Sequence, residues 1–175
     1  MMNKIFLFLF LMAGHLMAQD VQEVVQVEVS EDSLWARAIR LTGKFPLADD
    51  QEKLNRIDSS VLTVITNAGF EVYPNKLKTR VDGSIHYQFK MEIKEGKYRI
   101  SFFDFEYQPY ERNRYSRYVP VRGGKVPFES GPYGTKKSWQ RHIDRKNEVI
   151  KRQINFIKDF MVYEKAENEK NADDW

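Results

Sequence analysis

Arginine and tyrosine recur at close spacing in one segment of the chain, residues 107–118, which reads YQPYERNRYSRY. Arginine binds carboxylate or phosphate through paired hydrogen bonds, and tyrosine rings offer flat amphipathic contact surface. The wider segment 107–137 holds seven basic and two acidic residues, which suits an anionic partner. The candidate binding residues are Tyr107, Tyr110, Arg112, Arg114, Tyr115, Arg117 and Tyr118. Alternatively, the tyrosines pack over the end of a sheet, and the arginines stay solvated or pair with Glu106 or Glu111.

Other side chains give little support for catalysis or for a metal. The chain has no cysteine, and no G-x-S-x-G motif marks a nucleophilic serine. His86 and His142 are expected to face solvent or to cap an element. His142 and Asp144 stand two positions apart on a predicted helix and therefore point in different directions. We expect no catalytic residue, no metal and no cofactor.

Paired carboxylates are a remaining possibility, because their separation depends on the fold and not on sequence spacing. The sequence selects no particular pair. A small hydrolase acting on envelope polymers and a structural protein without a ligand therefore stay as alternatives to a binding module.

A β-hairpin over residues 84–107 is the clearest structural prediction. Apolar and polar residues alternate up to Glu95-Gly96, and a second alternating run begins at Tyr98. A two-residue loop at Glu95-Gly96 fixes the register. It pairs Ile93 with Tyr98, Glu92 with Arg99, Met91 with Ile100 and Phe89 with Phe102. The alternation then inverts, so Asp104 would face the core unless a β-bulge near Phe103-Asp104 shifts the phase or the outer face is covered.

Further elements flank this hairpin. Strands are expected over residues 21–29, 54–58, 60–66 and 70–73, with a break at 67–69 that leaves two strands or three in the region 54–73. A helix is predicted from Ser30 to a left-handed Gly43. Residues 118–121 and 125–128 could pair with each other as short strands. An apolar stripe predicts a long final helix over residues 136–163.

The two ends differ from the rest in composition. Residues 1–18 have the basic start, apolar run and small final residue, Ala18, of a secretory signal peptide. Export to the periplasm or the cell exterior is expected, with no transmembrane segment after cleavage. Residues 164–175 hold five acidic and two basic residues and are expected to be a disordered tail. Residues 19–163 suffice for a single α+β domain, in which residues 107–135 form a long basic, tyrosine-rich loop.

The hairpin and the first helix resemble an uncharacterised family of exported bacterial proteins, a domain of unknown function with a TBP-like fold. The resemblance covers residues 21–110 and, more faintly, the last helix. It is carried by the helix around Trp35 and by Tyr87, Phe89, Met91, Ile93, Gly96, Tyr98, Arg99, Ile100, Asp104 and Phe105. It implies a curved antiparallel sheet with helices packed on one face, and it implies no activity.

The predicted fold class is therefore α+β: a curved antiparallel sheet carrying an N-terminal helix and a long C-terminal helix. The predicted function is that of a non-enzymatic, exported binding or interaction module of the cell envelope. Its expected partner is an envelope protein or an acidic glycan; export argues against nucleic acid. The protein is expected to be a monomer or a weak homodimer.

Overall fold

The computed structural model describes residues 20–47, 53–75 and 80–163. The predicted signal peptide and the predicted acidic tail lie outside these residues. The strands are β1 (Val21–Gln26), β2 (Asn55–Asp58), β3 (Thr63–Val72), β4 (Gly83–Lys94), β5 (Lys97–Arg112), β6 (Tyr118–Pro120) and β7 (Val126–Pro127). The helices are α1 (Glu31–Leu41) and α2 (Lys136–Tyr163), with short 3₁₀ helices η1 (Thr42–Lys44) and η2 (Phe128–Ser130).

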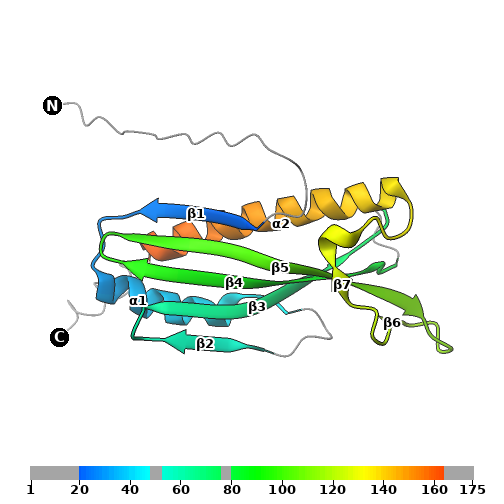
Figure 1. Ribbon diagram of the computed structural model, residues 1–175, viewed down its shortest axis with the longest axis horizontal. Coiled ribbons are helices and arrows are strands. Elements are labelled where there is room, and N and C mark those ends of the chain that lie inside the picture. The colour runs from blue at the N-terminus through cyan, green and yellow to red at the C-terminus, as the bar shows by residue number, and fades with distance from the viewer. Residues whose placement is uncertain (1–19, 48–52, 76–79, 164–175) are drawn as a thin grey trace, which may run out of the picture.

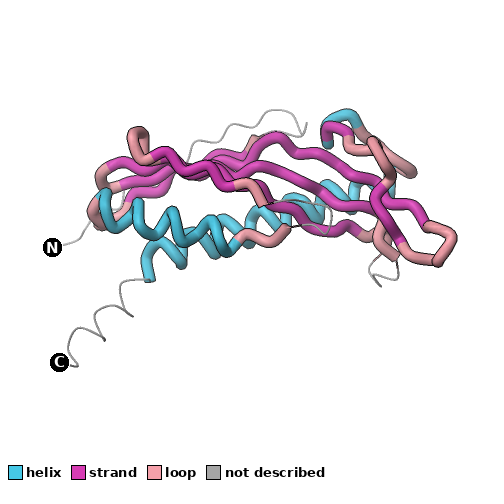
Figure 2. The backbone as a smooth tube through the Cα atoms, turned by 90° about the horizontal axis from the view of Figure 1, so that it is seen from below, coloured by secondary structure: helices cyan, strands magenta, loops and turns pink. Residues whose placement is uncertain are grey.

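All strands belong to one antiparallel arrangement, in which the order is β1-β5-β4-β3-β2 and both β6 and β7 pair with β5 (Figure 1). Both helices lie on the same side of the sheet (Figure 2). The predicted α+β class, with an N-terminal helix and a long C-terminal helix on a curved antiparallel sheet, is confirmed.

The core lies between the sheet and the helices, on the face that the hairpin alternation predicts. The pairs Ile93–Tyr98, Met91–Ile100 and Phe89–Phe102 all form in the expected register. Their side chains are buried. Phe89 contacts Phe45 and Phe102, with ring centroids 4.3 and 5.4 Å apart. On the opposite face Glu92 lies 3.6 Å from Arg99, as cross-strand pairing requires.

A β-bulge resolves the inversion beyond Phe102. The register between β4 and β5 shifts where Gln88 pairs with Phe103 and His86 with Glu106. Asp104 takes the positive φ of 52° and is exposed, and its Oδ2 accepts a hydrogen bond from Gln88. Phe105 and Tyr107 consequently return to the core face, where both are buried. The bulge therefore sets the direction in which β5 continues toward β6.

Three local predictions are wrong. Gly43 does not end the first helix in a left-handed conformation, because Thr42 remains helical and residues 42–44 continue as η1. Residues 67–69 do not break a strand: β3 runs unbroken to Val72 along the whole of β4. Residues 118–121 and 125–128 contribute β6 and β7, but these strands pair with β5 and not with each other. In the last two cases the long neighbouring strand supplies pairing partners that outweigh local sequence preference.

Candidate binding site at the tip of the β5–β6 hairpin

The segment predicted as a long loop, residues 107–135, contains the end of β5 and the two short strands that pair with β5, β6 and β7. Strand β5 continues to Arg112, and β6 returns antiparallel beside it, with Arg112 opposite Tyr118. The hairpin projects past the end of the sheet, away from α1 (Figure 1). We call residues 112–118 the hairpin tip.

Asn113 holds the tip in one conformation. Its Oδ1 accepts hydrogen bonds from the backbone N–H groups of Tyr115 and Arg117, at 2.9 and 3.0 Å. Its own N–H donates to the carbonyl of Arg117, and Ser116 N–H donates to the carbonyl of Asn113, both at 2.9 Å. Ser116 adopts the positive φ of 62°. An asparagine side chain that caps its own turn in this way pre-organises the loop before any ligand arrives.

The tip presents unpaired positive charge beside aromatic surface. Arg112, Arg114 and Arg117 are exposed, and none forms an ion pair with another residue that the structure describes. Tyr115 is 67% exposed, and the Arg114 guanidinium lies 4.8 Å from its ring centroid. Glu106, a carboxylate considered as a partner for these arginines, instead lies 3.6 Å from Lys125. The tip can therefore offer its guanidinium groups to an external anion.

The seven predicted binding residues lie in three places. Arg112, Arg114, Tyr115, Arg117 and Tyr118 belong to the tip. Tyr110 is half-buried, opposite Pro120 at the root of the hairpin. Tyr107 is buried with 3% exposure and belongs to the core, so it cannot contact a ligand at the tip.

Tyr107 instead joins an aromatic cluster that anchors the segment to α2. Its ring stacks on His142 and Tyr133, at 5.5 and 5.7 Å between centroids, and meets the edge of Trp139 at 5.3 Å. Trp139 also stacks on Phe128 at 4.7 Å. This anchor cluster, Tyr107, Phe128, Tyr133, Trp139 and His142, fixes the chain between β6 and α2 against the sheet.

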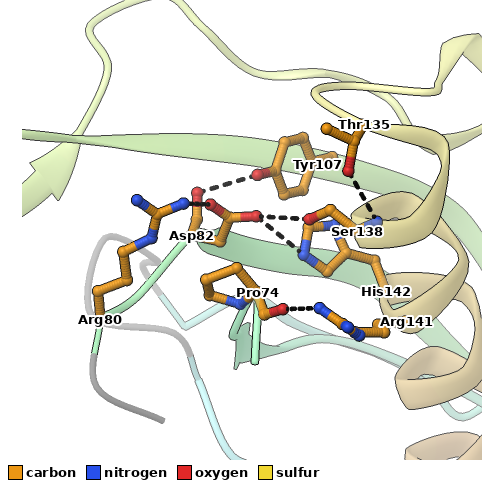
Figure 3. Close-up of polar contacts among 8 residues, drawn as sticks. All are labelled: Pro74, Arg80, Asp82, Tyr107, Thr135, Ser138, Arg141 and His142. Atoms are coloured by element: carbon orange, nitrogen blue, oxygen red, sulfur yellow. Dashed lines mark hydrogen bonds and ion pairs between the residues drawn. The ribbon is translucent and has the colours of Figure 1, made fainter. Parts of the chain in front are cut away.

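Polar contacts converge on Asp82, which precedes β4 and faces the first turns of α2 (Figure 3). Its Oδ2 lies 3.1 Å from His142 Nε2 and accepts a hydrogen bond from Ser138 Oγ at 3.3 Å, and its Oδ1 lies 3.6 Å from Arg80. The Tyr107 hydroxyl donates to the Asp82 carbonyl at 2.9 Å. The contact with His142 is the main cause that holds the pKa of Asp82 below its usual range.

This Asp-His-Ser group lacks the arrangement of a catalytic triad. In a triad, the serine bonds to the histidine and the carboxylate orients the opposite ring nitrogen. Here Ser138 and His142 Nε2 both face the same carboxylate, and His142 is fully buried. The group therefore joins α2 to the β3–β4 connection.

His86 and His142 lie in environments that differ from those predicted. His86, expected to face solvent or to cap, is 2% exposed and lies on β4 with its Nε2 2.9 Å from Ser84 Oγ. Lys146, which interrupts the apolar stripe of α2, is also buried, with its ammonium group 4.5 Å from the Phe105 ring and 5.2 Å from that of Phe128. Burial lowers the pKa of Lys146. His142 packs against Tyr107 and Lys146 against Phe128, so both help to support the segment 107–135.

The Asp82 contacts make stability sensitive to acid. Because the pKa of Asp82 is lower in the folded protein than in the unfolded chain, its contribution is fully present above about pH 4 and is lost as the pH falls through the folded value. Asp82→Asn should therefore flatten the loss of stability below about pH 4, measured as the urea midpoint against pH. Asp58, whose pKa is also lowered, is present in both proteins, so it makes the same acid-dependent contribution to the stability of each. Identical pH profiles for the two proteins would contradict this assignment.

Two surface grooves lie away from the tip. One, of about 510 Å³, contains Asp58 and Glu92, and the other, of about 270 Å³, lies between η1 and α2. Asp58 accepts hydrogen bonds from Ser60, which lower its pKa, and Glu92 lies 3.1 Å from Lys90 and 3.6 Å from Arg99. A hydrolase that uses two carboxylates requires one of them to remain protonated as the acid. The hydrogen bonds from Ser60 favour the charged form of Asp58 instead.

Comparison with solved structures defines the class of fold. The chain is similar to the crystal structure of a TBP-like protein from Parabacteroides distasonis, with a TM-score of 0.61 and 14% sequence identity. The similarity covers 82% of this chain and 92% of that one. The fold is therefore TBP-like, as the sequence resemblance implied.

A DUF4468 family protein from Bacteroides ovatus also matches, at 11% identity over 75% of this chain and 81% of that one, with a TM-score of 0.46. No protein-family model matches the chain, and no curated protein is similar to it. Within the described residues, no helix has both the length and the apolar character needed to cross a membrane.

Proposed function

We propose that this protein is an exported, non-enzymatic binding module of the cell envelope, and that its hairpin tip captures an anionic partner. The observation that carries the proposal is the tip itself. Three exposed arginines that have no carboxylate partner among the described residues, together with an exposed tyrosine, are held on a turn that Asn113 fixes in place. Export rests on the signal-peptide pattern of residues 1–18.

The chemistry of the tip favours carboxylate or phosphate groups that are spread along a surface or a polymer. Each guanidinium can form two parallel hydrogen bonds to such a group, and exposed tyrosine packs against sugar rings or apolar protein surface. An acidic glycan or an acidic envelope protein offers both features. The TBP-like similarity supports the fold alone and gives no reason to propose nucleic acid.

The alternatives have less support. A hydrolase that works through two carboxylates needs one of them protonated as the acid. In the larger groove, Asp58 accepts hydrogen bonds that lower its pKa, and Glu92 lies beside Lys90 and Arg99. A structural protein without a ligand would have no need for a pre-organised tip, and the hydrogen bonds of Asn113 favour a binding role.

The triple variant Arg112→Ser, Arg114→Ser, Arg117→Ser tests the proposal. It should keep the far-UV circular dichroism and thermal midpoint of the unmodified protein, because all three side chains are exposed and form no ion pair within the described part of the chain. Its affinity for immobilised polygalacturonate, or its retention of envelope proteins in a pull-down, should fall by at least about tenfold, since each lost charged hydrogen bond contributes about 1.5 kcal/mol or more.

A matched control removes the same charge elsewhere. Lys94→Ser, Lys97→Ser and Lys151→Ser replace three exposed cations, two beside the β4–β5 turn and one on α2. This control should bind as the unmodified protein does. Retention of polygalacturonate identifies a glycan, and retention of an envelope protein alone identifies a protein partner. Equal binding by the triple variant in both assays would contradict the proposal.

A further inference from the structure

Strand β2 leaves one edge of the sheet open. Within the described part of the chain it pairs only with β3 and is the last strand in the sheet order, and all four of its residues are exposed. Figure 1 shows no described element beyond it. Ile57 is 50% exposed and Val61, in the following turn, is 62% exposed. An exposed edge with apolar side chains is a surface on which another strand can add.

The register shows which backbone groups face this open edge. Asn67 N–H donates to the Leu54 carbonyl at 3.3 Å, so Leu54 and Asn67 form a hydrogen-bonded pair. Hydrogen-bonded and non-hydrogen-bonded pairs alternate along antiparallel strands. Arg56 and Asp58 therefore direct their backbone groups toward β3. Asn55 and Ile57 direct theirs outward, where they can pair with an added strand.

The sequence of β2 is complementary to itself in the antiparallel direction. A two-fold axis at Ile57 places this residue opposite the partner's Ile57, with backbone groups that can hydrogen-bond to each other. The same register places Arg56 opposite the partner's Asp58 and, by symmetry, Asp58 opposite the partner's Arg56. It also places Asn55 opposite the partner's Ser59. Each position thus meets a residue of opposite charge or of the same polarity.

The charges on β2 are available for such pairing. Arg56 forms no ion pair with any residue in the described ranges. Asp58 accepts hydrogen bonds from Ser60 N–H at 2.9 Å and from Ser60 Oγ at 2.6 Å, and these lower its pKa and keep it ionised. Arg56 and Asp58 both lie on the sheet face opposite the helices, because they align with Ile65 and Thr63 on the outer side of β3.

We propose that a second copy of this chain docks on β2 in this register and forms a weak two-fold homodimer with one continuous sheet. The interface is closed, since each β2 has one free edge and the two-fold axis uses both. Only about five residues of each strand take part, which is far below the area of a stable dimer, so association should be weak and depend on concentration. The inference is independent of the function proposed for the tip.

Sedimentation equilibrium of the mature protein, from about 10 µM to about 1 mM, is the primary test, since weak interfaces have dissociation constants in this range. The unmodified protein should self-associate. Ile57→Lys should weaken association at least about tenfold, because it places two like charges across the axis. The control Val24→Lys changes a similarly exposed apolar residue, at 59% exposure, on β1 at the other edge and should leave association unchanged.

A charge exchange tests the register itself. Arg56→Asp and Asp58→Lys should each be monomeric when alone. In either dimer, positions 56 and 58 of the two copies would carry charges of the same sign, and the two-fold axis repeats that unfavourable pair. An equimolar mixture should associate. In the mixed dimer the introduced carboxylate of the first variant faces the introduced ammonium group of the second, and the unchanged Asp58 of the first faces the unchanged Arg56 of the second.

Circular dichroism of each variant confirms that the β2–β3 turn survives the loss of the Asp58 hydrogen bonds. Three results would each overturn the inference: a protein that stays monomeric at about 1 mM, an Ile57→Lys variant that associates normally, or a charge-exchange mixture that stays monomeric.

Discussion

Replacing Phe89 with alanine is expected to lower the free energy of unfolding by about 3–5 kcal/mol. The Phe89 side chain is fully buried at the centre of the sheet and lies against Phe45 and Phe102, with ring centroids 4.3 and 5.4 Å away. Removing the ring loses its burial and leaves a cavity that close neighbours on β5 and after η1 cannot fill without moving. Urea denaturation followed by far-UV circular dichroism measures the difference.

Phe156→Ala is the matched control for this prediction. The same atoms are removed from α2, but Phe156 is 45% exposed. This variant should lower the free energy of unfolding by less than about 1 kcal/mol, because little buried area changes and no enclosed cavity forms. Comparable decreases in the free energy of unfolding for Phe89→Ala and Phe156→Ala would show that the hairpin face is not the principal core.

Replacing Trp139 with alanine should also lower the free energy of unfolding by about 3–5 kcal/mol, but its effect on hydrogen exchange should be local. Trp139 lies at the centre of the anchor cluster and packs so closely on Gly131 that a Cβ built there would be 2.2 Å from the indole ring. Its removal should release residues 126–133 from α2. Hydrogen exchange should therefore lose protection first in β7 and η2, while β4 stays protected.

Trp35→Ala provides the comparison on the other helix. Trp35 is only half-buried at the edge of the core, so Trp35→Ala should lower the free energy of unfolding less than Trp139→Ala does. It should leave hydrogen exchange in β7 and η2 unchanged. Uniform loss of protection across the whole sheet in Trp139→Ala would contradict a local anchoring role.

The hairpin could be predicted from sequence because its information is local. Alternation of apolar and polar residues sets the faces of β4 and β5, and the Glu95-Gly96 turn sets their register. Gly96 takes the positive φ of 67° that this turn requires. The inversion after Phe102 indicated either a bulge near Phe103-Asp104 or a covered outer face, since a charged residue on the core face would be costly. The bulge is the alternative that forms.

The packing that holds the segment 107–135 against α2 could not be predicted in the same way, because it depends on contacts between segments that are distant in the sequence. Asp82 meets His142 from a distant part of the sequence, and no local pattern pairs them. One signal was present: His142 and Lys146 follow Trp139 by three and seven positions, so they share its helix face. The burial of His142 and Lys146 then follows from the burial of Trp139.

The same limit applies to the predicted binding residues. The Arg-Tyr spacing located the tip, but it did not separate Tyr107 from Tyr115, which have opposite environments. Tyr107 precedes the end of pairing with β4 and is drawn into the core, whereas Tyr115 lies in the turn. The bulge, which sets the phase of β5, and the end of β5 at Arg112 together distinguish the two tyrosines.

Amide chemical shifts test most directly whether the tip binds an anionic partner. A titration of the ¹⁵N-labelled protein without residues 1–18, with oligogalacturonate or with an envelope protein recovered by pull-down, should give perturbations that begin at residues 112–118 and fade along β5 and β6. Perturbations centred on the groove that contains Asp58 and Glu92, with the tip unchanged, would contradict it.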